Sequence, residues 1–171
     1  MKYTPGWSSH YPVLIKVFEH TKGDVLELGM GLFSTPLLHW LCMDQHRKLI
    51  SLDRQQKYFD LNRRFQSDTH KIYLVEDWNK VDINHSWSFA LVDHDPAERR
   101  IEEIKKIANN TQYVIVHDTD PKENKYYHYD QIYPLFKYRY DYTLCSPNTT
   151  VLSNFFDLDF LYNKTNDKIQ I

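Results

Sequence analysis

Residues 24–35 read Asp24-Val-Leu-Glu-Leu-Gly-Met-Gly-Leu-Phe-Ser-Thr35, and this stretch decides the fold. The apolar residues 25–28 predict a short buried strand. Gly29 and Gly31 predict a tight turn after it, because glycine has no Cβ and adopts positive φ freely. The Ser-Thr-Pro sequence at 34–36 is typical of a helix start. Glycine backbone beside the unpaired amides of a helix start predicts a ligand-binding turn.

The overall composition favours one domain and gives no sign of a polyanionic partner. The chain has 171 residues, enough for a single core, and 21 Lys+Arg against 23 Asp+Glu give a formal net charge of -2. Cys42 and Cys145 lack a metal-binding or disulfide spacing, and no run is apolar enough to cross a bilayer. We therefore expect one domain over 1–171, with a flanking helix at about 8–20, a frayed tail at 163–171 and a cytoplasmic location.

Strands and helices are predicted to alternate along the chain. After the first strand, further apolar strands are predicted at residues 49–53, 71–75, 88–92 and 112–116. Helices are predicted at residues 11–19, 35–44, 55–65 and 96–108, and a helix or irregular segment at 125–136. Residues 140–145 and 149–155 predict a hairpin around Ser146-Pro-Asn148. This alternation predicts an α/β fold, with a mostly parallel sheet between two helical layers and an antiparallel hairpin at one edge.

Several motifs together resemble the class I S-adenosylmethionine-dependent methyltransferases over about residues 20–155. They are Glu27-Leu-Gly-Met-Gly, the acids Asp53, Asp77 and Asp93 after successive strands, and the terminal hairpin. The resemblance implies a three-layer, Rossmann-like, seven-stranded sheet of order 3-2-1-4-5-7-6. More narrowly, Leu91-Val-Asp-His-Asp with Val114-Ile-Val-His-Asp-Thr resembles the small O-methyltransferases of family 24, which are related to enzymes acting on sugars and natural products.

The resemblance also implies which residues contact the cofactor. They are Glu27, Gly29, Gly31, Ser34, Asp53, Asp77, Trp78 and Asp93. The glycine turn would hold the methionine part. Asp53 would accept hydrogen bonds from the ribose hydroxyls, since an ionised carboxylate is a strong bidentate acceptor, and Asp77 would accept from the adenine amine. Helix capping is the alternative for both acids.

The glycine turn departs from two known patterns. Phe33 stands where many class I methyltransferases have a third glycine, and Ser34 stands where a dinucleotide site requires one. A dinucleotide site is the alternative interpretation of the turn. Asp77 and the closing hairpin favour S-adenosylmethionine.

A second cluster of polar residues follows strands four and five, as Asp93-His94-Asp95 and His117-Asp118-Thr119-Asp120. The ends of neighbouring parallel strands meet at one edge of the sheet, so these residues are expected to face the substrate. Related O-methyltransferases bind Mg²⁺ with carboxylates there, which makes Asp93, Asp118 and Asp120 candidate ligands. Alternatively, His94 or His117 acts as general base beside Asp93. A third alternative is that these Asp and His residues pair structurally and cap the following helix.

The most consistent function is methyl transfer from S-adenosylmethionine to a small-molecule hydroxyl. Trp7 and His10 lie where a lid would meet the cleft, so either could line it, although simple packing is the favoured interpretation for Trp7. The tyrosine-rich residues 125–142 suit core packing, an aromatic or sugar acceptor or a homodimer surface better than nucleic acid, because acids dilute their charge. A nucleic-acid methyltransferase and a non-catalytic cofactor- or nucleotide-binding module are the alternatives.

Overall fold

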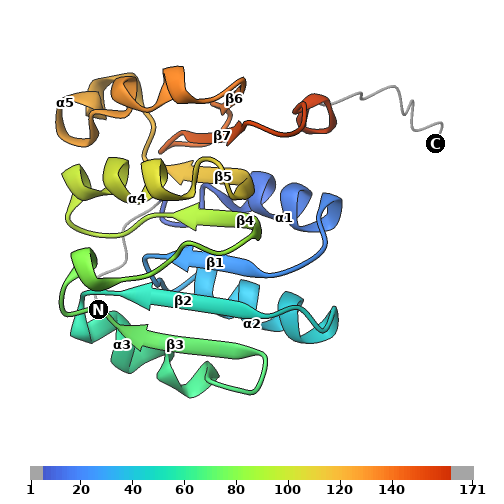
Figure 1. Ribbon diagram of the computed structural model, residues 1–171, viewed down its shortest axis with the longest axis vertical. Coiled ribbons are helices and arrows are strands. Elements are labelled where there is room, and N and C mark those ends of the chain that lie inside the picture. The colour runs from blue at the N-terminus through green and yellow to red at the C-terminus, as the bar shows by residue number, and fades with distance from the viewer. Residues whose placement is uncertain (1–5, 163–171) are drawn as a thin grey trace.

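The computed structural model describes residues 6–162, and its seven strands form one sheet of order β3-β2-β1-β4-β5-β7-β6 (Figure 1). The strands are β1 (Val25–Leu28), β2 (Leu49–Asp53), β3 (His70–Leu74), β4 (Trp87–Val92), β5 (Thr111–His117), β6 (Tyr138–Tyr142) and β7 (Thr149–Ser153). The first five are parallel, and β7 lies antiparallel between β5 and β6. The predicted order and edge hairpin are confirmed, whereas the predicted tail lies outside the described residues.

Helices cover both faces of the sheet. They are α1 (Tyr11–His20), α2 (Ser34–Asp44), α3 (Gln56–Asn62), α4 (Arg100–Ile107) and α5 (Asn124–Tyr127). Short 3-10 turns occupy Arg63–Phe65, Trp78–Lys80, Ala97–Arg99, Pro121–Glu123, Tyr129–Gln131, Tyr133–Leu135 and Asp159–Leu161. Within the described part of the chain, no helix is both long and apolar enough to cross a membrane.

The sheet has a separate apolar core on each face. One core joins α1 and α2 to strand residues such as Val25 and Phe89, and the other joins α4 to Leu26 and Ala90. This alternation follows the two-residue period of a strand. All six residues of β4 are buried, as expected for a central parallel strand with helices on both sides.

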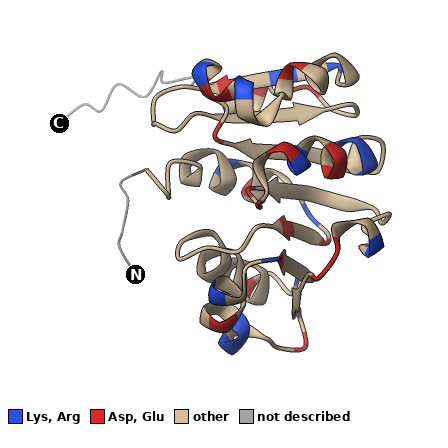
Figure 2. Cartoon of the chain, turned by 90° about the vertical axis from the view of Figure 1, so that its left-hand side faces the viewer, with Lys and Arg blue, Asp and Glu red and all other residues tan. Residues whose placement is uncertain are grey.

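Strand β1 marks the point where the sheet order reverses, since it pairs with both β2 and β4. Crevices outside the carboxyl ends of the strands at such points are where open α/β sheets bind ligands. Figure 2 shows Lys and Arg residues interspersed with Asp and Glu along the helices, without a continuous basic face in this view.

The predicted elements differ from the observed ones mainly at their ends. The flanking segment expected at about residues 8–20 begins with turns at residues 6–10, and its helix, predicted at residues 11–19, spans Tyr11–His20. The helix expected from Pro96 begins as the 3-10 turn Ala97–Arg99 and becomes α-helical at Arg100. Both shifts matter for the site, because they place His10 and Arg100 at its edge.

Candidate functional site

A cavity of about 330 Å³ opens at the carboxyl ends of β1, β2, β4 and β5. It is lined by residues 30–34 of the glycine turn, by Asp53 and Gln55 after β2, and by acids and a histidine after β4 and β5. Its size falls within the roughly 300–1,000 Å³ of small-molecule sites. The strand ends that the sequence singled out therefore do meet at one cavity, except for the end of β3.

The two glycines of the turn have different roles. Gly29 has φ +100°, and a Cβ at this position would lie 2.4 Å from the carbonyl carbon of Asp93. Gly31 lines the cavity, and a Cβ there would meet nothing closer than the Ser34 hydroxyl at 3.4 Å. Gly29 thus lets the end of β4 pack against the turn, whereas Gly31 offers its backbone to a ligand.

Glu27 supports the glycine turn from behind. Its fully buried carboxylate accepts hydrogen bonds from the hydroxyls of Thr35 (3.0 Å) and Ser51 (2.5 Å). The Thr35 hydroxyl in turn accepts from the amide of Gly31 (3.0 Å). Burial raises the pKa of Glu27 to about 7, against the opposing effect of these hydrogen bonds. Glu27 does not line the cavity. It therefore positions the glycine turn, and the predicted direct contact with the cofactor is not seen in this geometry.

Asp53 joins the turn to the cavity. One carboxylate oxygen accepts the amide of Met30 (2.7 Å) and the other accepts the amide of Gln55 (2.6 Å). Burial raises the pKa of Asp53 to about 6. Because a carboxylate has about four acceptor positions, these two bonds leave positions for a ligand. Asp53 therefore caps the segment that follows β2 and also lines the cavity. Helix capping and cofactor binding were alternatives in the sequence, and the geometry accommodates both.

Asp77 and Trp78 do not reach this cavity. Asp77 accepts the amide of Asn79 (2.9 Å) and lines a separate surface pocket. Trp78 is buried and donates its indole N–H to the carbonyl of Asp95 (3.2 Å). Their predicted position beside an adenine binding site is thus not observed, because Asp77 caps the 3-10 turn Trp78–Lys80 instead.

Other residues occupy the end of the cavity near β2. Gln55, Tyr58 and Asp95 line it there, and the Gln55 side-chain amide donates to the Asp95 carboxylate. Neither Gln55 nor Tyr58 was predicted to line the cavity. The only sequence feature that pointed to them was their position just after Asp53, at the start of the following helix.

His94 points into the protein, away from the cavity that Asp93 lines. Its Nε2 atom lies 3.2 Å from Glu103, and its ring packs 4.3 Å from the ring of Trp78. Burial lowers the pKa of His94. Asp93 lines the cavity, whereas His94 does not. The prediction that His94 is a base in the cavity is therefore wrong.

Arg100 holds the acids of β4 and β5 together. Its buried guanidinium lies 2.9 Å from Asp93 and 3.2 Å from Asp118. Burial opposes ionisation of Asp93, but the charges of His117 and Arg100 hold its pKa below the usual range. The sequence gives no sign that Arg100 points inward, because the 3-10 turn before α4 that turns it inward leaves no periodic signal.

Of the three predicted magnesium ligands, only Asp93 and Asp118 are brought together. Asp118 hydrogen-bonds with Arg100 and with the hydroxyl of Tyr127 (3.1 Å). Asp120 accepts the amide of Asn148 (2.9 Å) and does not line the cavity. The three-carboxylate set of Asp93, Asp118 and Asp120 is thus not assembled, and the prediction of a Mg²⁺ site built from it is wrong.

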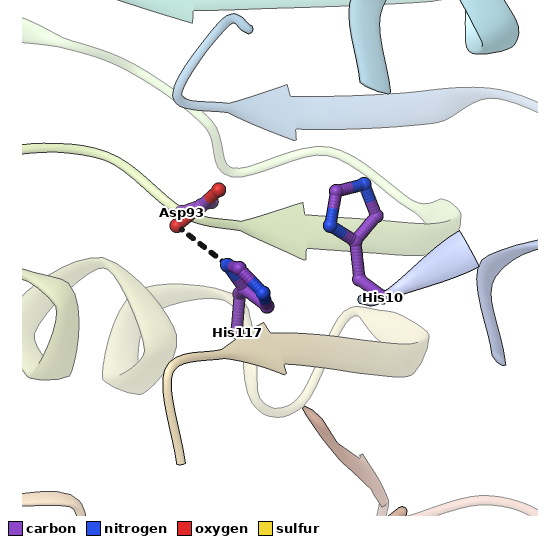
Figure 3. Close-up of side chains that lie close together, drawn as sticks. All are labelled: His10, Asp93 and His117. Atoms are coloured by element: carbon purple, nitrogen blue, oxygen red, sulfur yellow. Dashed lines mark ion pairs between the residues drawn. The ribbon is translucent and has the colours of Figure 1, made fainter. Parts of the chain in front are cut away.

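His117 and His10 complete the cavity beside Asp93, and Figure 3 shows the three side chains converging from different segments. Nδ1 of His117 lies 3.3 Å from Asp93 Oδ1, and its Nε2 lies 2.8 Å from the hydroxyl of Ser9. Burial opposes protonation, but the charge of Asp93 raises the pKa of His117. Trp7 also lines the cavity, so both residues lie in its wall, and a lid role for them stays a prediction.

Comparisons with known proteins identify the fold. The chain is similar to the structure of an O-methyltransferase from Bacillus cereus in complex with SAH, at 12% identity and TM-score 0.62, covering 89% of this chain and 82% of that chain. It is similar to cofactor-bound Rv0187 from MTB, at 14% identity and TM-score 0.66, covering 90% and 83% respectively. The N-terminal domain of human METTL16 in complex with SAH gives 9% identity and TM-score 0.63, covering 91% and 73%.

No protein-family model matches the sequence, and no curated protein is significantly similar to it. The structural comparisons nevertheless agree with the observed strand order, so the chain has the fold of S-adenosylmethionine-dependent methyltransferases.

Proposed function

We propose that this protein is an S-adenosylmethionine-dependent methyltransferase that methylates a hydroxyl of a small molecule. The observation that carries the proposal is the meeting of the glycine turn and Asp53 at one cavity, where Asp53 accepts the amide of Met30 at 2.7 Å. Gly31 and Ser34 would contact the methionine part, and the free acceptor positions of Asp53 would take the ribose hydroxyls.

The charge of the cavity supports a cationic cofactor and a small acceptor. Among the described residues that line it are four carboxylates, from Asp53, Asp93, Asp95 and Asp118, against the single cation of Arg100. A sulfonium cation is attracted by such a site, whereas a nucleic-acid backbone is repelled. The aromatic side chains of Phe33, Tyr58 and Tyr127 add surface on which a cofactor or an apolar acceptor can pack.

His117 is the proton acceptor that the geometry supports. The hydroxyl of Ser9 donates to the carbonyl of Pro147 (2.7 Å), so it accepts from Nε2–H of His117. In neutral His117, Nδ1 is therefore the lone-pair atom. Bound S-adenosylmethionine would supply the methyl group, and Nδ1 of His117, beside the Asp93 carboxylate, would take the proton of the acceptor hydroxyl.

The experiment that tests this activity is incubation with methyl-labelled S-adenosylmethionine and separate pools of hydroxylated small molecules, RNA and DNA. We expect label in a small-molecule pool, with formation of S-adenosylhomocysteine. Label only in nucleic acid would contradict the acceptor class, and cofactor binding without transfer to any pool would favour a non-catalytic module. The homodimer and the cytoplasmic location stay predictions.

A further inference from the structure

His10 presents an unexplained polar group in the wall of the cavity. Its side chain is 1% exposed, and neither ring nitrogen has a hydrogen-bond partner among the described residues. Its ring makes edge contacts with the rings of Tyr11 and His117, at centroid distances of 5.3 and 5.0 Å. A buried polar group without a partner costs about 1–3 kcal/mol, so a site that leaves two of them open requires an explanation.

The tautomer of His117 creates a second such group. Its Nε2 carries the hydrogen that Ser9 accepts, since the single hydroxyl hydrogen of Ser9 is donated to Pro147. Nδ1 then presents a lone pair toward an Asp93 oxygen 3.3 Å away, and it makes no hydrogen bond with proper geometry. Two electron-rich atoms at this separation repel each other unless positive charge, either a proton on Nδ1 or a metal ion, lies between them.

We propose that His10, Asp93 and His117 bind a divalent first-row metal ion such as Zn²⁺. One ligand atom from each of the three side chains lies within 4.8 Å of the others. In a tetrahedral zinc site, bonds of about 2.0–2.1 Å place the ligand atoms about 3.3 Å apart. The His117–Asp93 pair already has this spacing, and the ligand atom of His10 lies within 4.8 Å of both partners.

The ligand types decide the class of ion. Two imidazoles and one carboxylate suit zinc and other first-row transition metals, whereas Mg²⁺ prefers a shell of oxygen atoms. The three side chains also line the cavity, so a fourth coordination position would open toward the ligand space. Open fourth positions are characteristic of catalytic rather than structural zinc sites.

The surroundings of the three ligands match those of known metal sites. Metal-binding imidazoles usually donate their second N–H to a fixed acceptor, and metal-binding carboxylates are themselves hydrogen-bonded. Ser9 fills the first role for His117, and Arg100 fills the second for Asp93 at 2.9 Å. The charge of Arg100 is shared with Asp118, so the cluster retains net negative charge for a dication.

A catalytic role for the ion rests on the proposed function, whereas binding of the ion does not. With an ion bound, Nδ1 of His117 would be a ligand rather than the base, and the ion would instead lower the pKa of the acceptor hydroxyl. The ion would also tie the start of α1, through His10, to the ends of β4 and β5.

The test is titration of the untagged, full-length protein with Co²⁺ in the absence of cofactor, followed by absorption and by displacement with Zn²⁺. We expect one ion per chain with a tetrahedral cobalt spectrum. His10→Ala and Asp93→Asn should each weaken binding by roughly tenfold or more. The matched control is His39→Ala, which removes the other close histidine pair, whose Nδ1 atoms lie 3.2 Å apart, and should leave cobalt binding unchanged.

Equal loss of binding in His39→Ala, or full binding in His10→Ala, would overturn the site. If His10→Ala does not fold, the wild-type cobalt spectrum still decides, because an octahedral all-oxygen spectrum or no binding also contradicts the proposal. Failure of cobalt binding would leave cofactor binding by the glycine turn intact, so the two proposals fail separately.

Discussion

Gly29 and Asp93 pack backbone against backbone, and a Cβ added to Gly29 would lie 2.4 Å from the carbonyl carbon of Asp93. This contact fixes the glycine turn, which would hold the methyl donor, against Asp93, which would face the acceptor. The spacing between donor and acceptor sites is thus set by main-chain packing, which is more rigid than side-chain contact.

The two glycines of the turn should respond oppositely to the same substitution. Gly29→Ala is expected to lower the free energy of unfolding by several kcal/mol, because it adds a severe clash to a positive φ. Gly31→Ala should leave stability nearly unchanged and weaken cofactor binding, since Gly31 lines the cavity without crowding. Urea unfolding and calorimetric titration of both variants check this. Equal destabilisation by both would contradict it.

Glu27 should make stability fall as the pH rises. Burial raises its folded-state pKa to about 7, so the folded protein retains a proton that the unfolded chain loses above its lower, ordinary pKa of about 4.3. The wild type therefore loses stability between about pH 4.3 and 7, by about 1.4 kcal/mol per pH unit at most. Glu27→Gln removes this loss, so its stability relative to wild type should improve from pH 5 to pH 8 in urea unfolding.

The control for this prediction is Glu19→Gln, since Glu19 is an exposed acid on α1. The stability difference from wild type should change more with pH for Glu27→Gln than for this exposed-site control. A pH-independent difference for Glu27→Gln would contradict the raised pKa of Glu27.

Arg100 should be important for stability. Replacing it with Met leaves Asp93 and Asp118 without their cationic partner, and removing one member of a buried ion pair costs about 3–5 kcal/mol. Lys105→Met is the matched control, because its pair with Glu102 is solvent-exposed and contributes little. Thermal or urea unfolding measures the difference. Equal effects of the two substitutions would refute the structural role of Arg100.

The sequence predicts the sheet better than the site, and the reason is physical. Apolar runs such as residues 25–28 and 88–92 are set by burial on both faces, and burial leaves a pattern in the sequence. The direction of a side chain just past a strand end depends on local caps and turns. His94 and Asp77 therefore turned away from the cavity, although their positions in the chain looked equivalent to those of Asp93 and Asp53.

Residues brought in from distant segments were the hardest to predict. Arg100 and Gln55 enter the cavity through the first turns of helices, and their sequence neighbours gave no period that pointed inward. His10 was recognisable only as a residue near the cleft. Its proximity to His117 depends on how α1 packs against the sheet, which sequence spacing does not encode.

Cofactor binding should weaken in acid. Burial raises the pKa of Asp53 to about 6 against the opposing amide hydrogen bonds from Gln55 and Met30, and the charges of Asp95 and Asp93 add smaller contributions in the direction of burial. Below this pH the carboxyl group is protonated and loses acceptor positions for the ribose hydroxyls. The affinity for S-adenosylhomocysteine should therefore fall as the pH is lowered from 7.5 to 5. Titrations at several pH values check this, and an affinity that is constant over this range would contradict it.

The most direct test of the account is calorimetric titration of S-adenosylhomocysteine into the wild type, Asp53→Ala and Asp77→Asn. We predict that the wild type binds one equivalent, and that Asp53→Ala weakens binding by about tenfold or more, the loss of a hydrogen bond to a charged group. Asp77→Asn should bind like the wild type, because Asp77 lies outside the cavity. Absence of binding to the wild type, or unchanged binding by Asp53→Ala, would contradict the central claim.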